Sequence, residues 1–521
     1  MKKRFLAASM AAAMVVGMVP VAAFAEESEL PTITFMVTDF QAGGSLAQEN
    51  SDKVIAAYEE YTGIHVDWVW KDNGAYAELF ATTLMDFDNM PMILTATGQE
   101  MSGTVVEAAE EGAFWDLAPF LESGDYPNLA SAEPLTMKGL TVGGEVIGIP
   151  RLRELGRYGM SYRTDWAEAV GITEAPDTIE EVYDMLYKFT YNDPDGNGQN
   201  DTYGMEMTKY TGPFDIIQTW FGCGKNWQEV DGELVPVHMT AEYKEAIDWI
   251  KKLYDEGIMR PDWVTVDTSE WSNGCKTGKN GVFIDVMDSG RRIWDYFVNN
   301  EVMSVTNPEE YASMTLLGPV NGHTMATSGF NGFYVITKDG AKTEEDVKNC
   351  LTFLDKMNDR EMLILADYGL EGITYNWDED GYLVRVEGLD TATTPHVGLN
   401  QAVAYVPGYA EGENPLKQTE RDAALTECYV ERTRPVAVGD PAATYLPLSE
   451  TYAKYGSELT TILDDARTQY ICGTIDEAGL QAAWDDWYER GGADLIAEVN
   501  AAYQADHPVA DEEVESETAA E

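Results

Sequence analysis

The chain has 521 residues, 34 of them basic and 91 acidic, so its formal net charge is −57. This charge excludes proteins that bind nucleic acid or anionic lipid through a basic surface. A hydrophobic content of 44% excludes wholesale disorder, and the length predicts two or more lobes.

Residues 1–25 have the pattern of a cleavable signal peptide. Basic residues 2–4 precede an uncharged run over residues 5–22, and Ala23-Phe24-Ala25 supplies the small-x-small pattern of a cleavage site. A retained membrane anchor is the alternative, which Pro20 within the run disfavours. We therefore expect an exported protein, extracellular, cell-surface or periplasmic, and not lipid-anchored because no cysteine lies near the cut.

Short apolar strands alternate with helices over the next part of the chain. Strands are predicted at 32–37, 65–70 and 91–95, and helices at 52–61, 75–85 and 104–111. This alternation is typical of βαβ units and predicts an α/β fold with a mainly parallel sheet. Ligands of such sheets bind beyond the carboxyl ends of the strands. The candidate site residues by this criterion are Asp39, Trp70, Thr97 and Gln99, with an ordinary loop position as the alternative for each.

A strand predicted at 146–150 leads into a second α/β unit. Further strands are predicted at 160–163, 281–285, 314–317 and 330–337, and helices at 166–170, 243–256 and 347–357. Thr178 followed by Glu181 forms a capping box and predicts the start of another helix. The chain beyond about 415 is mostly helical by pattern, and we expect the acidic tail, residues 504–521, to be disordered.

The nine residues from Asp193 to Asp201 have the oxygen spacing of a calcium-binding loop. Side-chain oxygens recur at positions 1, 3, 5 and 9 of the motif, with glycine at position 6. The expected ligands of a structural Ca²⁺ are the side chains of Asp193, Asp195, Asn197 and Asp201 and the backbone carbonyl of Gln199. Gly204 replaces the usual bidentate glutamate, and Glu206 is nearby but out of register, so the last ligand stays open. An Asx-rich surface turn is the alternative.

The sequence contains no motif of a known catalytic centre. The five histidines lack metal-ligand spacing, GxSxG and Walker loops are missing, and no pair among the 91 acidic residues stands out as a glycosidase pair. The five cysteines form no CxxC, which disfavours a zinc site and leaves room for at most an isolated disulfide. We therefore expect a protein that is not an enzyme.

Aromatic residues beside turns favour a sugar-binding cleft. Aromatic faces stack on the apolar faces of sugar rings while neighbouring polar groups bond the hydroxyls. The examples are Trp220, Trp227, Trp271 and Trp377, and for each of them a packed core position is the alternative. Arg151 and Arg153 adjoin the predicted hinge at Pro150; they suit an acidic or hydroxylated ligand, or equally salt bridges in an acid-rich protein.

The order of several motifs resembles that of one known family. The matching stretches are GEVIGIPR (144–151), SYRTDWAEAVGI (161–172), PDTIEEVYDMLYKF (176–189), DPDGNGQNDTYG (193–204), YKEAIDWIKKLYDEGI (243–258), GKNGVFIDV (278–286) and YGLEGITYNWDEDG (368–381). Over about residues 31–390 the chain resembles the family-1 extracellular solute-binding proteins of ABC importers, in their LipO-like and alginate-binding branch. The loop at 193–201 looks like the calcium site of that branch, although Thr202 replaces a frequent acidic residue and the lipobox cysteine is missing.

The resemblance implies a two-lobed periplasmic-binding-protein fold of type II, with parallel-rich sheets flanked by helices and a ligand cleft between the lobes. It assigns residues 31–150 and 329–390 to lobe 1 and residues 151–328 and 391–503 to lobe 2, with crossings near 150 and 328. By topology, the expected ligand-binding residues are Asp39, Thr97, Gln99, Arg151, Arg153, Tyr158, Trp220, Trp271 and Asp288.

The implied function is capture of a carbohydrate, an oligosaccharide, by hinge closure and delivery to the permease subunits of an ABC importer. We expect a monomer that binds no nucleic acid. A polyanionic sugar suits so negative a surface only where the cleft is locally basic. Two alternatives remain, a secreted polysaccharide-degrading enzyme and a subunit that presents ligand to a membrane sensor.

Overall fold

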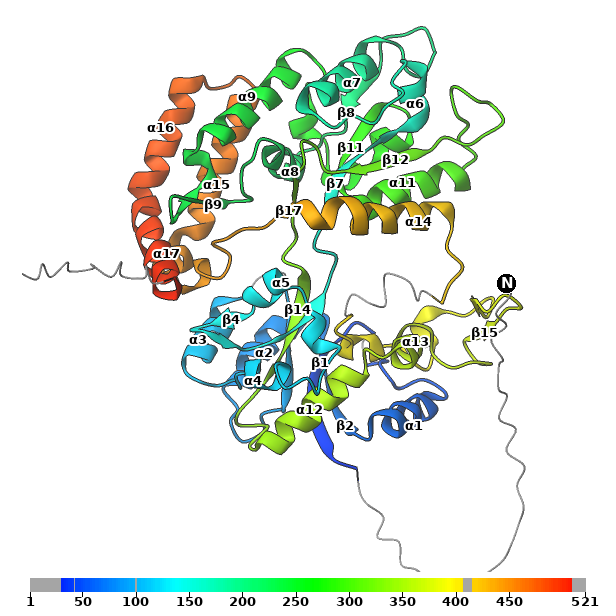
Figure 1. Cartoon of the computed structure of the whole chain (residues 1–521), viewed down its shortest axis with the longest axis vertical. Helices are drawn as coiled ribbons and strands as arrows, with labels where there is room; N and C mark the ends of the chain where they lie inside the picture. Colours follow the sequence, from blue (N-terminus) through cyan, green and yellow to red (C-terminus); the bar gives the residue numbers. More distant parts are fainter. Residues whose placement is uncertain (1–29, 42, 99–100, 406–414, 508–521) are drawn as a thin grey trace, which may run out of the picture.

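The computed structural model describes residues 30–41, 43–98, 101–405 and 415–507. The predicted signal peptide, the candidate Gln99 and the tail beyond residue 507 lie outside the described residues. The chain forms two α/β lobes, one above the other in Figure 1, with the N-terminal strands in the lower lobe. This is the predicted two-lobed arrangement.

Lobe 1 is built on a five-stranded sheet of order β2-β1-β3-β14-β6. The strands are β1 (Thr32–Asp39), β2 (His65–Asp72), β3 (Ile93–Ala96), β6 (Ile149–Leu152) and β14 (Phe330–Ile336). β1 runs parallel to β2 and β3, and β14 runs antiparallel to β3 and β6. Side chains of period two fill both faces: Phe35 and Tyr334 lie in one core, and Met36 and Val335 lie in the other.

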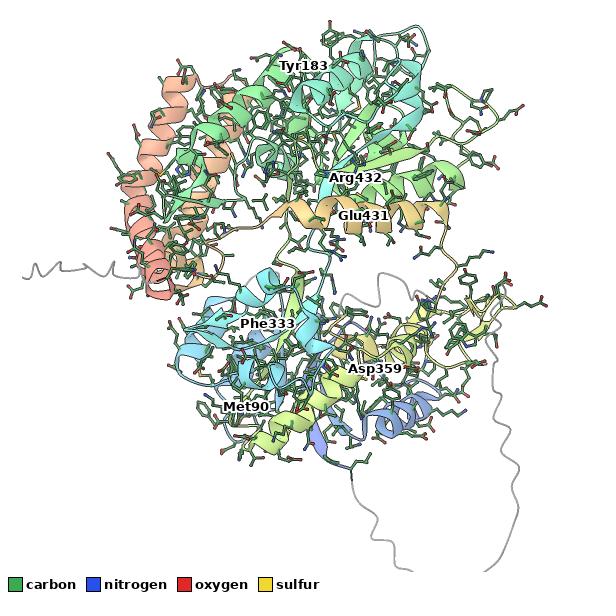
Figure 2. The ribbon with its side chains drawn as sticks, viewed as in Figure 1. Met90, Tyr183, Phe333, Asp359, Glu431 and Arg432 are labelled. Atoms are coloured by element: carbon green, nitrogen blue, oxygen red, sulfur yellow. The ribbon has the colours of Figure 1, made fainter. Side chains whose placement is uncertain are left out.

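The rest of lobe 1 consists of helices and short strands, most of them packed around this sheet (Figure 1). They are α1 (Ser51–Thr62), α2 (Tyr76–Leu84), α3 (Gly103–Glu110), α4 (Ala118–Leu121), α5 (Pro134–Lys138), α12 (Glu344–Lys356) and α13 (Arg360–Tyr368), with hairpins β4 (Thr141–Val142)–β5 (Glu145–Val146) and β15 (Tyr375–Trp377)–β16 (Leu383–Arg385). The strand predicted at 146–150 is thus divided between β5 and β6. Gly148 lies at the break, where a Cβ would come within 2.8 Å of the Phe333 ring. Figure 2 shows Phe333 inside lobe 1.

Lobe 2 contains a four-stranded sheet of order β12-β7-β11-β8. Its strands are β7 (Tyr158–Arg163), β8 (Tyr203–Met205), β11 (Asn280–Val286) and β12 (Met314–Gly318). β7 is antiparallel to β11 and β12, and only β8 and β11 are parallel. The prediction of a parallel-rich sheet is therefore wrong for lobe 2. The physical reason is the connectivity. The chain enters lobe 2 along β7 and leaves it along β12, so these neighbouring strands run in opposite directions.

The helices of lobe 2 include α6 (Thr164–Ala169), α7 (Ile179–Tyr191), α8 (Gly212–Trp220), α9 (Ala241–Asp255), α10 (Asn273–Lys276) and α11 (Met287–Asn299), beside the hairpin β9 (Trp227–Val230)–β10 (Glu233–Pro236). α7 begins at the predicted capping box, because Thr178 Oγ1 accepts the Glu181 N–H and the Glu181 carboxylate accepts the Thr178 N–H.

The C-terminal helices complete lobe 2. They are α14 (Glu420–Glu427), α15 (Glu450–Ile471), α16 (Glu477–Trp487) and α17 (Ala493–Asp506), and α15 packs on α9. The helical prediction beyond 415 is confirmed. The tail predicted from residue 504 begins too early, since 504–506 are the last turn of α17. No helix within the described ranges combines the length and apolar composition needed to cross a membrane.

The second lobe boundary differs from the prediction. Leu399, Ala402 and Val403 lie in the core of lobe 1. The Leu152 N–H donates to Ala404 O at 2.7 Å, and Tyr334 Oη donates to Val403 O at 3.0 Å. Residues 391–405 therefore belong to lobe 1 instead of lobe 2, because their apolar side chains complete the lobe-1 core. The chain therefore crosses between the lobes a third time, entering lobe 2 again just before α14.

Candidate functional site

Three chain segments lie side by side where the lobes meet. Residues 153–157 lead from β6 to β7, and residues 326–329 lead from β13 (Thr324–Met325) to β14. The Arg153 N–H donates to Gly329 O at 2.8 Å. On the other side of residues 326–329, the Ala326 N–H donates at 2.9 Å to the carbonyl of Val438, the last residue of β17 (Ala437–Val438). We call residues 153–157, 326–329 and 437–438 the crossing ribbon; cavities open at both of its edges.

The cavity beside the first crossing has a volume of about 490 Å³ and is lined by both lobes. A second cavity of about 370 Å³, in lobe 1, shares Asn400 and Gln401 with it. We call the two together the arginine cleft. Its lining includes Arg151, Arg153, Glu154, Tyr405, Tyr429 and Arg434 in the first cavity and Phe40, Asp367, Arg385 and His396 in the second. Glu431 and Arg432, which lie between the lining residues Tyr429 and Arg434 in the chain, are on the part of lobe 2 that faces lobe 1 (Figure 2).

Arg151 and Arg153 lie in the arginine cleft as the hinge position predicted. Neither guanidinium has a carboxylate within 4.0 Å among the described residues. The Arg153 Nη1–H donates to Leu152 O at 2.7 Å, and the guanidinium carbon lies 5.8 Å from the centre of the Tyr405 ring. Nε of Arg151 is buried and has no hydrogen-bond partner. Ligand binding by the two residues stays a prediction.

Asp288 does not line the cleft but accepts a hydrogen bond from Tyr429, which does. Its carboxylate accepts hydrogen bonds from Arg157 Nε at 2.8 Å and from Tyr429 Oη at 3.3 Å, and Arg292 Nη2 lies 2.7 Å away. Burial raises the pKa of Asp288, but the hydrogen bond and charge of Arg157 outweigh it, so the pKa lies below its usual value. Asp288 is itself absent from the lining. It positions Tyr429, which together with Arg434 lines the cleft from lobe 2; we call these two residues the lobe-2 wall.

Asp39 has a similar indirect place. Its buried carboxylate accepts the N–H of Gln41 at 2.8 Å, Oγ–H of Ser45 at 2.8 Å and the N–H of Gly43. These bonds hold the loop that follows β1, which carries Phe40, 57% exposed, into the lining of the second cavity. The prediction that Asp39 faces the ligand is wrong, since the loop occupies its oxygens. The adjacent Phe40 is the residue that the strand-end argument missed.

The other topological candidates lie elsewhere. Trp220 is fully buried in the lobe-2 core, so its prediction as a ligand contact is wrong; α8 turns this side chain inward. Trp271 packs on Phe283 with ring centres 4.9 Å apart. Tyr158 is half-buried at the start of β7, and Thr97 is exposed after β3, but neither lines the arginine cleft. Trp70 is half-buried and stacks on Trp68 at 5.2 Å.

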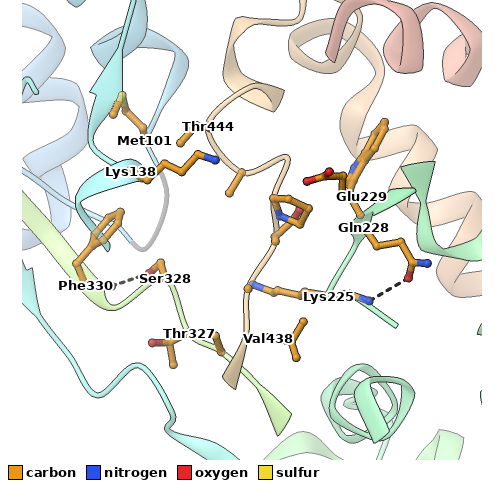
Figure 3. A pocket seen from close by; sticks show the side chains of 18 of the residues that line it. Met101, Lys138, Lys225, Gln228, Glu229, Thr327, Ser328, Phe330, Val438 and Thr444 are labelled. Carbon is orange, nitrogen blue, oxygen red and sulfur yellow. Dashed lines mark hydrogen bonds between the residues drawn. The ribbon is translucent and has the colours of Figure 1, made fainter. Parts of the chain in front are cut away.

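A cavity of about 410 Å³ opens at the opposite edge of the crossing ribbon. Figure 3 shows Lys138 and Phe330 of lobe 1 on one side of it and Lys225 and Glu229 of lobe 2 on the other. Residues 438–441, 443 and 444 complete the lining. The crossing ribbon therefore separates two cavities that both lobes line.

The predicted calcium loop follows α7. Asp193 carboxylate oxygens accept the N–H groups of Asn197 and Gly198, both at 3.0 Å. The Asn197 amide donates to Asp195 at 2.7 Å and to Asp201 at 3.1 Å. Positive φ angles of 66° at Gly196 and 78° at Gly198 allow the tight coil that brings these groups together.

These residues suit a hard cation by their chemistry. Burial raises the pKa of Asp195, and the nearby carboxylates of Asp193 and Asp201 raise it further. The Asn197 amide donates hydrogen bonds between the carboxylates, and the Lys279 ammonium, 2.6 Å from Asp201, is the positive charge next to them. Within the described ranges no three His, Cys, Asp or Glu side chains gather closely enough to hold a metal by themselves. Glu206 turns away from the loop, since its Oε2 accepts the Cys275 N–H at 2.9 Å.

All five cysteines are free, four of them buried. The thiols therefore stabilise the cores as small apolar side chains, and no disulfide ties the lobes together.

Comparison with known proteins identifies relatives along nearly the whole chain. The model of the bacterial extracellular solute-binding protein family matches residues 44–286. Lipoprotein LipO of Bacillus subtilis is 33% identical over 97% of this chain and 99% of its own. A second Bacillus subtilis protein, the polygalacturonan/rhamnogalacturonan-binding protein YtcQ, is 28% identical over 88% of this chain and 89% of its own.

A solved structure shares the fold. The solute-binding protein of an ABC transporter for human milk oligosaccharides (HMO), from Bifidobacterium longum infantis, superposes with a TM-score of 0.64 at 17% identity. The match covers 91% of this chain and 98% of that structure.

Proposed function

The chain belongs to the bacterial extracellular solute-binding proteins, and we propose that it captures an oligosaccharide between its lobes for delivery to an ABC-type importer. The arginine cleft carries this proposal, because its lining joins both lobes beside the crossing ribbon. Phe40, Tyr405 and Tyr429 offer aromatic faces, and Asn400 and Gln401 offer amides for sugar hydroxyls. The sugar-binding names of YtcQ and of the milk-oligosaccharide protein support the same class of ligand.

Binding to both walls at once would couple capture to closure. Glu154, in the first crossing, accepts hydrogen bonds from Arg434 Nη2 at 2.7 Å and from Nε at 3.1 Å. This pair fixes the lobe-2 wall to the crossing ribbon. A ligand that touches lobe 1 and that wall makes its full set of contacts only in the closed form, so it shifts the population toward closure.

No covalent step is part of this proposal. The carboxylates that line the cleft include Glu154, paired with Arg434, and Asp367, which accepts a hydrogen bond from Tyr405 Oη at 2.8 Å. Both are held in structural contacts. Incubation of purified protein with oligosaccharides should therefore leave them intact by mass spectrometry; accumulating cleavage products would favour the degrading enzyme.

Thermal-shift and calorimetric titration over a panel of oligosaccharides and peptides tests the capture. A bound sugar at 100 times its Kd should stabilise the native protein by about 2.7 kcal/mol. Indifference to every sugar, with stabilisation by peptides, would refute the carbohydrate assignment. Cells lacking the protein should take up the bound sugar more slowly; normal uptake with a lost transcriptional response would favour the sensor subunit instead.

We also propose that the loop at 193–201 binds one structural Ca²⁺. The side chains of Asp193, Asp195, Asn197 and Asp201 and the carbonyl of Gln199 would hold it and relieve the repulsion between the carboxylates. A chelator should lower the melting temperature, and added Ca²⁺ should restore it. An unchanged melting temperature together with no metal by elemental analysis would mean that the loop is only a turn.

Export is the last element of the proposal. We propose cleavage after Ala25 and release without a lipid anchor, since the first cysteine of the sequence is Cys223. The relative LipO bears the name of a lipoprotein, so the anchor needs its own test. Mass spectrometry of the exported protein should give an unmodified N-terminus at Glu26; a lipid-modified N-terminus would contradict it.

A further inference from the structure

We propose that the oligosaccharide is acidic and that Arg151 and Arg153 bind one of its carboxylate groups. This inference rests on the proposed carbohydrate binding and names the class of sugar. Its basis is the pairing of charges around the arginine cleft.

Basic side chains in this protein have an excess of partners, because 91 acidic residues face 34 basic ones. Most arginines of the described chain hold a carboxylate within 4.0 Å; they are Arg157, Arg163, Arg260, Arg291, Arg292, Arg421, Arg434, Arg467 and Arg490. Arg151 and Arg153 sit together in one cavity without such a partner among the described residues. A vacant pair of cations in so acidic a protein is a binding feature that salt bridging does not explain.

The geometry directs the pair into the cavity. The two residues are two positions apart, Arg151 inside β6 and Arg153 directly after its last residue, and both line the same cavity. The buried Nε of Arg151 lacks an acceptor, which is costly unless a ligand supplies one. A carboxylate meets a guanidinium through two parallel N–H···O bonds, so it satisfies this donor better than a hydroxyl does.

The nearby acids leave this pair available. Glu154 accepts from Arg434 with both oxygens and from the Gly156 N–H at 3.1 Å. Glu133 also lines the cavity but lies beyond 4.0 Å from either arginine. The first cavity thus has three arginines against two glutamates, one positive charge in excess. Ionic screening over about 8–10 Å limits the repulsion from the rest of the surface, so the local charge decides.

The remaining lining suits the sugar that carries the carboxylate. The Tyr405 ring lies beneath Arg153, and Tyr429 stands on the lobe-2 side. Desolvation in the cleft and the charge of Arg151 lower the pKa of Arg153, although solvent still reaches the side chain. A bound carboxylate would offset this repulsion. In the adjoining cavity Arg385 also lacks a carboxylate partner among the described residues, which adds a further unpaired cation along the cleft.

Three probes of equal length test the charge requirement by calorimetry: tetragalacturonate, its methyl ester and a neutral galactotetraose. The acid should bind at least tenfold more tightly than the ester, because methylation removes the charge and keeps the shape. Raising NaCl from 50 to 300 mM should weaken binding of the acid and leave binding of the neutral probe unchanged.

Substitutions locate the effect. Arg151→Gln and Arg153→Gln should each weaken binding of the acid about tenfold or more, with little change for the neutral probe. Arg151→Lys keeps the charge but loses the two-bond geometry and should lie in between. Arg490→Gln, an exposed arginine paired with Glu458, is the matched control and should bind as the native protein does. Unchanged melting temperatures would show that the variants are folded.

The outcomes separate the two proposals. Equal or tighter binding of the neutral probe or the ester, unaffected by the arginine variants, would overturn the acidic ligand and leave carbohydrate capture standing. Failure of every oligosaccharide in the panel to bind would overturn the capture itself, and the acidic ligand with it.

Discussion

Glu206 allows a quantitative test of the packing in lobe 2. Its carboxyl is buried beneath α10, where Oε2 accepts the Cys275 N–H at 2.9 Å, and it forms no ion pair within the described ranges. Burial raises the pKa of Glu206 from 4.5 to about 7, against the opposing hydrogen bond from Cys275 and the charge of Arg260. With about 1.4 kcal/mol per pKa unit, this rise corresponds to about 3 kcal/mol of folding free energy.

The sign follows from the proton count. Between pH 4.5 and about 7 the folded protein holds this proton and the unfolded chain has lost it. The contribution of Glu206 to stability is therefore full below pH 4.5 and is lost as pH rises toward 7. Glu206→Gln is neutral at every pH and keeps an oxygen for the Cys275 N–H. We expect it to match the native protein at pH 4.5 and to exceed its stability by about 3 kcal/mol at pH 8.

Urea unfolding at pH 4.5, 5.5, 6.5 and 8, followed by tryptophan fluorescence, measures this difference. Glu245→Gln, an exposed glutamate on α9, is the matched control and should show no pH-dependent difference. A constant difference between Glu206→Gln and the native protein across the pH range would refute the reasoning, as would a less stable variant at pH 8. Repeating the series with a chelator separates the effect from the calcium loop.

Three further changes test other parts of the structure. Trp220→Ala should lower the free energy of unfolding by about 3–5 kcal/mol, because it empties a fully buried site, and urea unfolding would show it. Thr178→Ala removes one bond of the capping box and should cost about 1 kcal/mol by the same assay, with Thr178→Ser as the near-native control. Gly156→Ala places a Cβ against the backbone nitrogen of Arg434, so it should displace the lobe-2 wall and reduce the thermal shift given by bound sugar; an unchanged shift would contradict the role of this contact.

Local chemistry was enough to predict many elements. The capping box at Thr178 starts α7, because both of its bonds lie within four residues. The short apolar run at 32–37 predicts β1, whose successive side chains pack into the two cores on opposite faces of the sheet. The Asx-rich stretch after Asp193 forms a tight coil for the same local reason. Arg151 was found by its place beside the hinge.

Other features depend on residues far apart in the chain. The sequence predicts that Trp220 and Asp39 contact a ligand, but the lobe-2 core encloses Trp220 and the loop to Ser45 occupies the Asp39 carboxylate. Residues 399–404 stay in lobe 1 because its folded core buries their apolar side chains. No local pattern marks such burial or pairing.

The sequence by itself therefore determined the two-lobed α/β class, most helices and strands, and the hinge arginines. Only the tertiary structure decided which residues line the cleft and which charges remain unpaired. The reason is that Arg151 differs from the salt-bridged arginines only in its surroundings. Its neighbours in the cavity include Tyr405 and Tyr429, which are far from Arg151 in the sequence.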